Sequence, residues 1–316
     1  MPDKVAVWIL GDQLLADHPA IVKAEEEVGR EGVQVVMVES EQRLQRHPYQ
    51  AKKLVLLLSA MRHYAEQLRS QGYHVEVVKA PAFIEGLRSF VAKSSPDRLY
   101  CMAANDYRAR KFQHQRMEEA LDLPVSILEN ALFLVEQHDP YPDSEPDKRY
   151  RQEYFYRKMR RHFQILMDGE EPAGGQWNYD KQNRQPLPEG EQAPGPITFQ
   201  PDAITKEVMD EVRSIESKTG TVAGFKLAVT RQEALQALDD FIDHRLAKFG
   251  PYEDAMTSGQ TILYHSYLSA YLNLGLLEPM ELIQAAEQAL EDGSALLQTL
   301  TQLVVIGQVA VVCDRQ

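Results

Sequence analysis

Cysteine is almost absent from this 316-residue chain, which holds only Cys101 and Cys313. Two cysteines so far apart provide neither a disulfide framework nor a four-cysteine metal site. Long apolar runs are lacking as well, because the best candidate, residues 296–312, is interrupted by glutamine, threonine and glycine. The N-terminus has no basic segment followed by a cleavage site. We therefore expect a cytoplasmic protein that does not span a membrane.

Positive charge is scarce, since 34 Lys and Arg residues face 47 Asp and Glu residues and the formal net charge is -13. This balance argues against a protein that coats nucleic acid by charge alone, but it allows a local basic groove. A G-x-G-x-x-G turn is missing after the first predicted strand, which disfavours a dinucleotide site of that type. The hydrophobic content of 44% is ordinary and permits a core of normal size.

Short apolar runs alternate with helical patterns in the first part of the chain. Strands are predicted at residues 5–10, 33–39, 73–78, 98–103 and 125–128. This alternation is typical of a doubly wound parallel sheet that is covered on both faces. Beyond residue 205 the pattern is helical, with Thr230 and Glu233 forming a capping box and a further helix over 279–290.

A proline-rich acidic stretch at residues 139–147 indicates a domain boundary. We expect an α/β domain over 1–135, an interdomain linker with a basic and aromatic helix over 136–205, and a helical domain over 206–316. The fold class is thus α/β followed by all-α.

Two acidic residues fall at predicted strand ends, where parallel sheets bind ligands. Asp12 follows the first strand within the sequence LGDQL, and Glu39 ends the second strand. A turn or helix cap for Asp12 and a solvated strand end for Glu39 are the simpler interpretations, and composition alone favours them.

The segment 150–167 concentrates cations among tyrosines and phenylalanines. Basic and aromatic groups together suit phosphates and stacked bases. An amphipathic helix whose arginines pair with nearby acids is the alternative, and the residues leave both open. The candidate DNA-binding residues are Arg157, Lys158, Arg160 and Arg161.

The stretch 249–277 mixes hydroxyls, a histidine and tyrosines with leucines. Placed on a helix over 261–274, His265, Leu268 and Ser269 would share one face. Their polar groups need partners, which are either one another and the backbone or the phosphates and sugar hydroxyls of a cofactor. Backbone N–H groups at Ser258 and Gly259, ahead of that helix, would suit a phosphate.

Several segments resemble the photolyase–cryptochrome superfamily, in its bacterial branch of iron–sulfur, (6-4) photolyase-like proteins. They are VWILGDQL, LLLSAMRHYAEQLRSQGYHVEVV, YFYRKMRRHFQILM, GGQWNYDKQNRQP and RLAKFGPYEDAMTSGQTILYHSYLSAYLNLGLLEP. The resemblance implies an antenna domain followed by a helical domain that holds FAD. It also implies light-driven electron transfer from reduced FAD to a pyrimidine (6-4) lesion that is flipped out of damaged DNA.

The resemblance also transfers site residues to this chain. The expected FAD contacts are Tyr252, His265, Ser266, Leu268, Ser269 and Asn273. Some members of the branch bind a lumazine antenna chromophore, and the matching positions here are Ile9, Gly11, Asp12 and Glu39. No catalytic residue and no metal ligand is assigned.

After Gly293 the sequence SALLQTLTQLVVIGQVAVVCDRQ departs from the family pattern. We expect this tail, from about residue 294, to be a frameshift product or an aberrant truncation that sequencing of the locus would test. The helical domain would then lack its second half, including the cluster cysteines, and its open apolar faces would favour self-association. A cryptochrome-type blue-light receptor and a non-catalytic module that binds a chromophore or a partner are the alternatives to a DNA photolyase.

Overall fold

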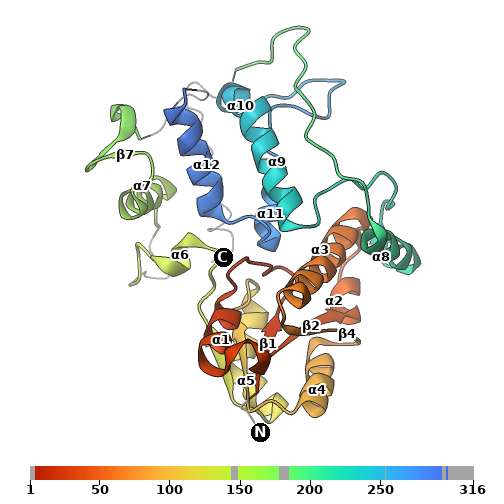
Figure 1. Ribbon diagram of the computed structural model, residues 1–316. Coiled ribbons are helices and arrows are strands. Elements are labelled where there is room, and N and C mark those ends of the chain that lie inside the picture. The colour runs from red at the N-terminus through yellow and green to blue at the C-terminus, as the bar shows by residue number, and fades with distance from the viewer. Residues whose placement is uncertain (1–3, 144–148, 178–184, 253, 294–296, 298–316) are drawn as a thin grey trace. The chain divides into compact units, whose positions relative to one another are not determined.

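The computed structural model describes residues 4–143, 149–177, 185–252, 254–293 and 297 (Figure 1). The chain forms two compact units. Unit 1 comprises Met1–Leu132, Thr198–Ala234 and Asn273–Leu276, and unit 2 comprises Phe133–Ile197, Leu235–Leu272 and Leu277–Gln316. The tail expected to be aberrant lies outside the described residues, apart from residue 297.

Unit 1 is built on a five-stranded parallel sheet in the order β4-β2-β1-β5-β6. In the register, Val5 lies opposite Val33 on one side and Arg98 on the other. The strand order reverses beside β1, which confirms the predicted doubly wound α/β fold. The strands are β1 (Val5–Ile9), β2 (Val33–Ser40), β4 (His74–Ala80), β5 (Arg98–Met102) and β6 (Val125–Leu128).

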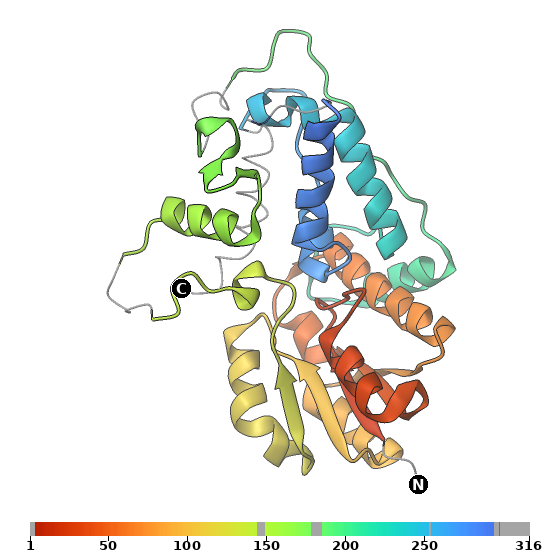
Figure 2. The ribbon, with the colours of Figure 1, turned by 60° about the vertical axis from the view of Figure 1, so that its left-hand side comes forward.

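Both faces of this sheet are covered by helices, because the central strands are apolar on both sides. Ala6 and Trp8 of β1 share a core with Leu87 of α4 and Met117 of α5. On the other face, α1 packs on β1, β2 and β5, and α3 packs on β2 and β4. Figure 2 shows α1 and α5 on opposite sides of the strands. These helices are α1 (Pro19–Gly32), α3 (Ala51–Ser70), α4 (Phe83–Ser94) and α5 (Tyr107–Leu121), with the short α2 (Glu41–Gln45) after β2.

A segment from beyond residue 200 completes unit 1. Helix α8 (Ala203–Ser214) packs on α3, although the sequence grouped residues from 206 onward with the helical domain. The short strand β9 (Lys218–Thr219) pairs in parallel with β3 (Tyr49–Gln50). The Asp202 carboxylate caps α8 by accepting a hydrogen bond from the Thr205 backbone at 2.8 Å.

Unit 2 is mainly helical, as the sequence indicates. Its first part also contains a two-stranded antiparallel ladder of β7 (Met167–Asp168) and β8 (Glu171–Pro172), followed by the 3-10 turn η1 (Ala173–Gly175). No helix in the described part of the chain is both long and apolar enough to cross a membrane. Besides α8, the helices from residue 133 onward are α6 (Leu134–Gln137), α7 (Gln152–Phe163), α9 (Arg231–His244), α10 (Leu246–Tyr252), α11 (Ser269–Leu274) and α12 (Pro279–Glu291).

The helix predicted over 261–274 is wrong for most of its length, because only Ser269–Leu274 is helical. Tyr267 adopts a left-handed conformation at φ 61°, which interrupts any helix. The Leu263 N–H donates to the Tyr267 hydroxyl at 3.1 Å, and the Leu268 N–H donates to the Ser266 hydroxyl at 3.4 Å. The Ser266 hydroxyl thus takes a backbone donor that a helix would need. His265 and Ser269 therefore do not share a helix face.

Gly86 allows α4 to lie close to β2. A Cβ atom at this position would come within 2.7 Å of Val38 Cγ1 and 3.2 Å of Ala80 Cβ. Both neighbours are buried. The stiff valine and the alanine Cβ on the strands leave little room for adjustment.

We expect Gly86→Ala to lower the free energy of unfolding by about 1–2 kcal/mol, because overpacking outweighs the better helix propensity of alanine. Ser89→Ala, on the exposed side of the same helix, is the matched control and should stay within about 0.5 kcal/mol of wild type. Urea denaturation of both variants measures the difference. Equal stabilities would contradict the close packing.

Candidate functional site

A network of amide side chains lies at the carboxyl ends of β1 and β5. Asn105 donates to Asp12 Oδ2 at 3.2 Å, and Asn130 donates to Asn105 Oδ1 at 2.6 Å. Asn130 and Gln13 also donate to the Ala103 carbonyl, at 2.8 Å and 2.9 Å. The strand order reverses between these two strands, which is where open α/β sheets bind ligands.

The chemistry of this network depends on Asp12 and Gln13. Burial raises the pKa of Asp12 above its ordinary range, although Arg43 and Asn105 act to lower it. Gln13 Oε1 is buried and accepts no hydrogen bond within the described part of the chain. A carboxyl group and an amide oxygen of this kind can bind the polar edge of a heterocyclic ring.

Gly11 and Ile9, the other residues predicted beside Asp12, offer little space to a ligand. Ile9 is fully buried in the sheet. A Cβ atom on Gly11 would come within 2.5 Å of Met61 Sδ, so glycine lets the turn approach α3 closely. Among Ile9, Gly11 and Asp12, only the Asp12 side chain takes part in the amide network.

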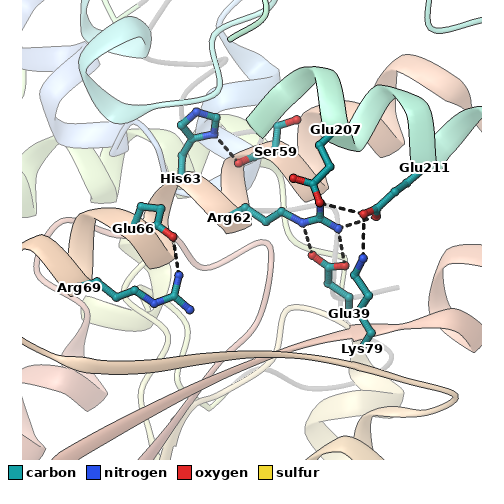
Figure 3. Close-up of polar contacts among 9 residues, drawn as sticks. All are labelled: Glu39, Ser59, Arg62, His63, Glu66, Arg69, Lys79, Glu207 and Glu211. Atoms are coloured by element: carbon teal, nitrogen blue, oxygen red, sulfur yellow. Dashed lines mark hydrogen bonds and ion pairs between the residues drawn. The ribbon is translucent and has the colours of Figure 1, made fainter. Parts of the chain in front are cut away.

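Glu39, the fourth predicted antenna residue, is engaged in an ion pair, as Figure 3 shows. Its carboxylate is buried and accepts from Arg62 Nε at 2.8 Å and from Arg62 Nη2 at 2.9 Å. The interpretation of Glu39 as a solvated strand end is therefore wrong. Both oxygen atoms are used inside unit 1, because the strand end is covered by α3.

Arg62 also joins α3 to α8. Its Nη2 atom lies 2.6 Å from Glu211 Oε2, and Lys79 of β4 donates to Glu211 Oε1 at 2.8 Å. On the same side of α3, His63 bridges the Ser59 carbonyl and the Asp202 carboxylate at 2.7 Å and 3.0 Å. This cluster fixes the carboxyl end of β2 and the position of α8.

The residues expected to contact FAD lie in two different local structures. Tyr252 ends α10, while His265, Ser266 and Leu268 lie in the irregular segment before α11. Ser269 and Asn273 lie four residues apart on α11, both exposed, and share one side of that helix. Leu268 is buried and its carbonyl accepts the first backbone bonds of α11, so its role here is to start the helix.

The polypeptide around 185–197 is tied to this region within unit 2. Lys248 Nζ lies 2.5 Å from Glu191 Oε1, and the Tyr264 hydroxyl donates to the same carboxylate. Gln260 donates to the Glu191 carbonyl at 2.8 Å. The ring of Tyr264 lies 5.7 Å from that of Tyr252. Glu191 thus fixes the segment that leads into His265.

The four cations predicted to bind DNA have different surroundings on α7. Arg160 is fully buried and donates to the carbonyls of Ile165, Leu166 and Trp177. Arg161 is exposed, with its guanidinium 4.6 Å from the Trp177 ring centroid. Burial of this kind makes Arg160 a structural residue and argues against it as a phosphate ligand.

Arg157 and Lys158 keep more freedom than Arg160. Arg157 pairs with Glu153 at 2.7 Å and lies 5.2 Å from the Trp177 ring centroid. Lys158 is exposed and donates to the Pro140 carbonyl at 2.9 Å. Among the described residues, Arg157 pairs with an acid and no acid pairs with Arg160 or Arg161, so the alternative in which the arginines of this helix pair with acids holds there for Arg157.

Metal ligands do not gather in the described part of the chain, where no group of three or more His, Cys, Asp or Glu side chains could hold an ion. Cys101 is buried in β5, and burial raises the pKa of its thiol to about 12. Cys313 lies outside the described residues. Two cysteines do not fit a cluster with four thiolate ligands.

Residues 7–227 match the family described as deoxyribodipyrimidine photo-lyase-related protein. The chain belongs to this family. It is also 36% identical over 296 residues to a (6-4) photolyase of Agrobacterium fabrum, a match that covers 92% of this chain and 57% of that protein. The chain thus spans little more than half the length of this curated photolyase-family relative.

Two solved structures have the same fold as this photolyase-related chain. One is a bacterial class III photolyase from Agrobacterium tumefaciens, with a TM-score of 0.61, 16% identity, and coverage of 98% of this chain and 58% of that one. The other is a cryptochrome from Synechocystis sp. PCC6803, with a TM-score of 0.62, 17% identity, and coverage of 98% and 62%. At these identities the likeness concerns the fold.

Several residues at these sites were not predicted from the sequence of this photolyase-family member. Asn105 follows β5 as Asp12 follows β1, so the rule about strand ends could have identified it. Asn130 follows β6 in the same way. Arg62 carries no comparable local signal, because its partners lie far away in the sequence.

We expect Arg62→Met to lower the free energy of unfolding by about 3 kcal/mol, because it leaves the Glu39 carboxylate buried without its partner. The double variant Glu39→Met/Arg62→Met should recover part of that loss. Lys93→Met, which breaks an exposed pair with Glu76, is the control and should change stability by less than about 1 kcal/mol. If the double variant were less stable than Arg62→Met in urea denaturation, the interpretation would be wrong.

We expect acidic pH to weaken the attachment of α8 to the rest of unit 1, because two carboxylates that hold this helix would be protonated. Burial acts to raise the pKa of Glu211 and of Asp202, but hydrogen bonds from Arg62 and Lys79, and from Thr205 and His63, outweigh it and hold both values below the ordinary 4.5 and 3.8. A depressed folded pKa stabilises the fold above the unfolded pKa, and this stabilisation is lost as pH falls through the folded value.

Hydrogen exchange of the α8 amides at pH 6 and at about pH 3.5 measures this effect, after correction for the intrinsic rate. Protection should fall more in the wild-type protein than in Asp202→Asn/Glu211→Gln, whose side chains do not titrate. An equal fall in both proteins would show that other groups control the acid response.

Proposed function

We propose that this chain is part of a light-driven, FAD-dependent photolyase that repairs pyrimidine (6-4) lesions in DNA. The 36% identity over 92% of the chain to a protein named as a (6-4) photolyase carries this proposal. Because the chain spans 57% of that relative, the activity of the whole relative is not assumed for this chain. The shared fold of the photolyase and the cryptochrome supports the flavoprotein class.

The residues on and before α11 fit a flavin nucleotide by their donor chemistry. The Ser269 hydroxyl and the Asn273 amide are exposed and have no side-chain hydrogen-bond partner among the described residues. Groups of this kind bind phosphate oxygens and ribityl hydroxyls. Reduced FAD, when bound, would supply the electron that light transfers to the lesion. The protein would bind and orient it through Tyr252, His265, Ser266, Ser269 and Asn273.

DNA would be bound in part by α7. Lys158 and Arg161 are exposed, and Arg157 is half-buried beside the Trp177 ring. Exposed cations next to an indole can contact phosphates and stack on an unpaired base. A lesion weakens stacking in the duplex, which lowers the cost of moving the damaged base out of the helix. Arg160 would support this surface indirectly, because its hydrogen bond to the Trp177 carbonyl holds the tryptophan in place.

An antenna chromophore such as lumazine belongs to the proposal at the carboxyl end of β1. Asp12 and Asn105 would bind the polar edge of its ring, and Glu39 would act indirectly by holding Arg62 and α3 in place. Binding of an iron–sulfur cluster is not proposed, because the cysteine content does not fit.

Absorption spectroscopy of the purified chain tests the cofactors, and illumination with a (6-4) lesion in DNA tests the repair. We expect a flavin spectrum and loss of the lesion under blue light. Flavin binding without repair would favour the alternative of a cryptochrome-type receptor. A colourless protein that takes up no FAD would overturn the proposal and favour a non-catalytic module; light scattering would then report self-association.

Arg160 and Arg161 provide a matched pair of variants on α7. Arg161→Gln should leave thermal stability unchanged and weaken binding to lesion DNA by roughly threefold, because one phosphate contact is lost. Arg160→Gln should lower the free energy of unfolding by about 3 kcal/mol, because buried carbonyls lose a charged donor. Equal stabilities would contradict the structural role of Arg160, and unchanged binding by Arg161→Gln would remove α7 from the proposed DNA surface.

A further inference from the structure

Several cations on the outside of unit 1 are paired with carboxylates. Salt bridges of 2.6 to 2.9 Å join Arg30 to Glu25, Arg69 to Glu66, Lys93 to Glu76 and Arg98 to Glu27.

The cations at the carboxyl edge of the sheet differ from these. After β2 come Arg43, Arg46 and Lys53, and after β5 come Arg108 and Lys111, all of them exposed. None of the five has an ion-pair partner among the residues that the structure describes. Because all five strands are parallel, the segments after β2 and β5 leave the sheet at the same edge.

Two further observations connect these segments. Arg43, from the segment after β2, and Asp106, from the segment after β5, both act electrostatically on Asp12 at the end of β1. The segments that carry the two groups of cations therefore leave the same edge of the sheet on either side of β1, and a residue of each segment lies near Asp12. We call Arg43, Arg46, Lys53, Arg108 and Lys111 the basic edge.

The distribution of charge along α5 does not favour the stability of the helix. Arg108, Arg110 and Lys111 lie near its N-terminus, where the helix dipole repels cations, and Glu118 and Glu119 lie in its last turn, where the dipole repels anions. The capping carboxylate of Asp106 offsets only part of this cost. Arg110 donates to the Ala104 carbonyl at 3.0 Å, but no contact among the described residues explains Arg108 and Lys111, and an anionic partner would.

Aromatic side chains lie among these cations. Tyr107, at the start of α5, is 72% exposed. Tyr49 is half-buried, with Lys53 Nζ 5.7 Å from its ring centroid and His47 edge-on to it. Exposed tyrosines beside cations are typical of surfaces that contact the sugar and phosphate backbone of nucleic acids.

We propose that the basic edge of unit 1 binds the phosphodiester backbone of duplex DNA, separately from α7. The cations come from two segments on either side of β1, which suits a regular array of phosphates rather than a single small anion. Local binding is compatible with the formal net charge of -13, because association depends on how charge is distributed. The choice of DNA over RNA rests on the proposed function.

Removal of two charges at a time tests the proposal. The edge variants are Arg108→Gln/Lys111→Gln and Arg46→Gln/Lys53→Gln. The control, Lys23→Gln/Lys93→Gln, removes the same charge from two exposed cations that pair with carboxylates. Fluorescence anisotropy with undamaged duplex DNA at several salt concentrations measures the affinity of the intact chain.

We expect each edge variant to lose roughly five- to tenfold in affinity, and to lower the slope of log affinity against log salt by about 1 to 2. The control should bind as the wild-type protein does. Arg108→Gln/Lys111→Gln should also keep or raise the melting temperature, because it removes cations from a helix N-terminus. A lower melting temperature would show a structural role for these cations and overturn the proposal.

Other results separate the basic edge from the proposed repair function. If wild-type protein shows no preference for a (6-4) lesion but the edge variants still lose duplex affinity, the repair function fails and the basic edge stands. If the edge variants bind undamaged duplex as the control does, the proposal is overturned whatever the repair assay shows. If the edge variants lost equal affinity for duplex RNA, the choice of DNA would be overturned.

If the edge variants dissociated a dimer without changing DNA affinity, the surface would be assigned to a second copy of the chain.

Discussion

The ion pairs of Arg62 with Glu39 and Glu211 are the interactions on which the arrangement of unit 1 depends. The Arg62 guanidinium donates to both oxygens of Glu39 at the end of β2 and to both oxygens of Glu211 on α8, and Lys79 of β4 also donates to one oxygen of Glu211 (Figure 3). Four elements from sequence positions 39 to 211 thus meet in one charged cluster. The Glu39 carboxylate is buried, and a buried charge is stable only when its partner is in place, so the cluster favours one arrangement of β2, α3 and α8.

This cluster changes how the carboxyl end of the sheet can bind a ligand. The Glu39 carboxylate is used inside the protein, so the polar groups left for a ligand are those at the ends of β1, β5 and β6. There Asp12, Asn105 and Asn130 form a chain of hydrogen bonds beside the point where the strand order reverses. Around them lie the exposed cations of the basic edge. The proposed chromophore site at Asp12 and Asn105 and the proposed phosphate-binding surface of the basic edge can therefore lie at the same edge of the sheet.

Residues of the same type have different roles on α7 because the helix has a buried and an exposed side. Arg160 points inward and satisfies backbone carbonyls, while Arg161, the next residue, lies exposed over the same tryptophan. Mutation of either residue would weaken the proposed DNA-binding surface, but for different reasons. The first would disturb the position of Trp177, and the second would remove a charge that DNA can reach.

The sequence by itself determined the elements of the α/β unit, the capping box at Thr230 and Glu233, and the family. Short continuous apolar runs, helices with one apolar face and capping residues reflect local physics, and the family motifs are local as well. Only the tertiary structure decided that Glu39 is buried against Arg62, that α8 packs on α3, and that residues 261–268 are not helical. The first two outcomes depend on partners that are distant in sequence. The third depends on the left-handed backbone at Tyr267 and on the Ser266 hydroxyl, which takes a backbone donor. Hydrophobic periodicity contains no information on either.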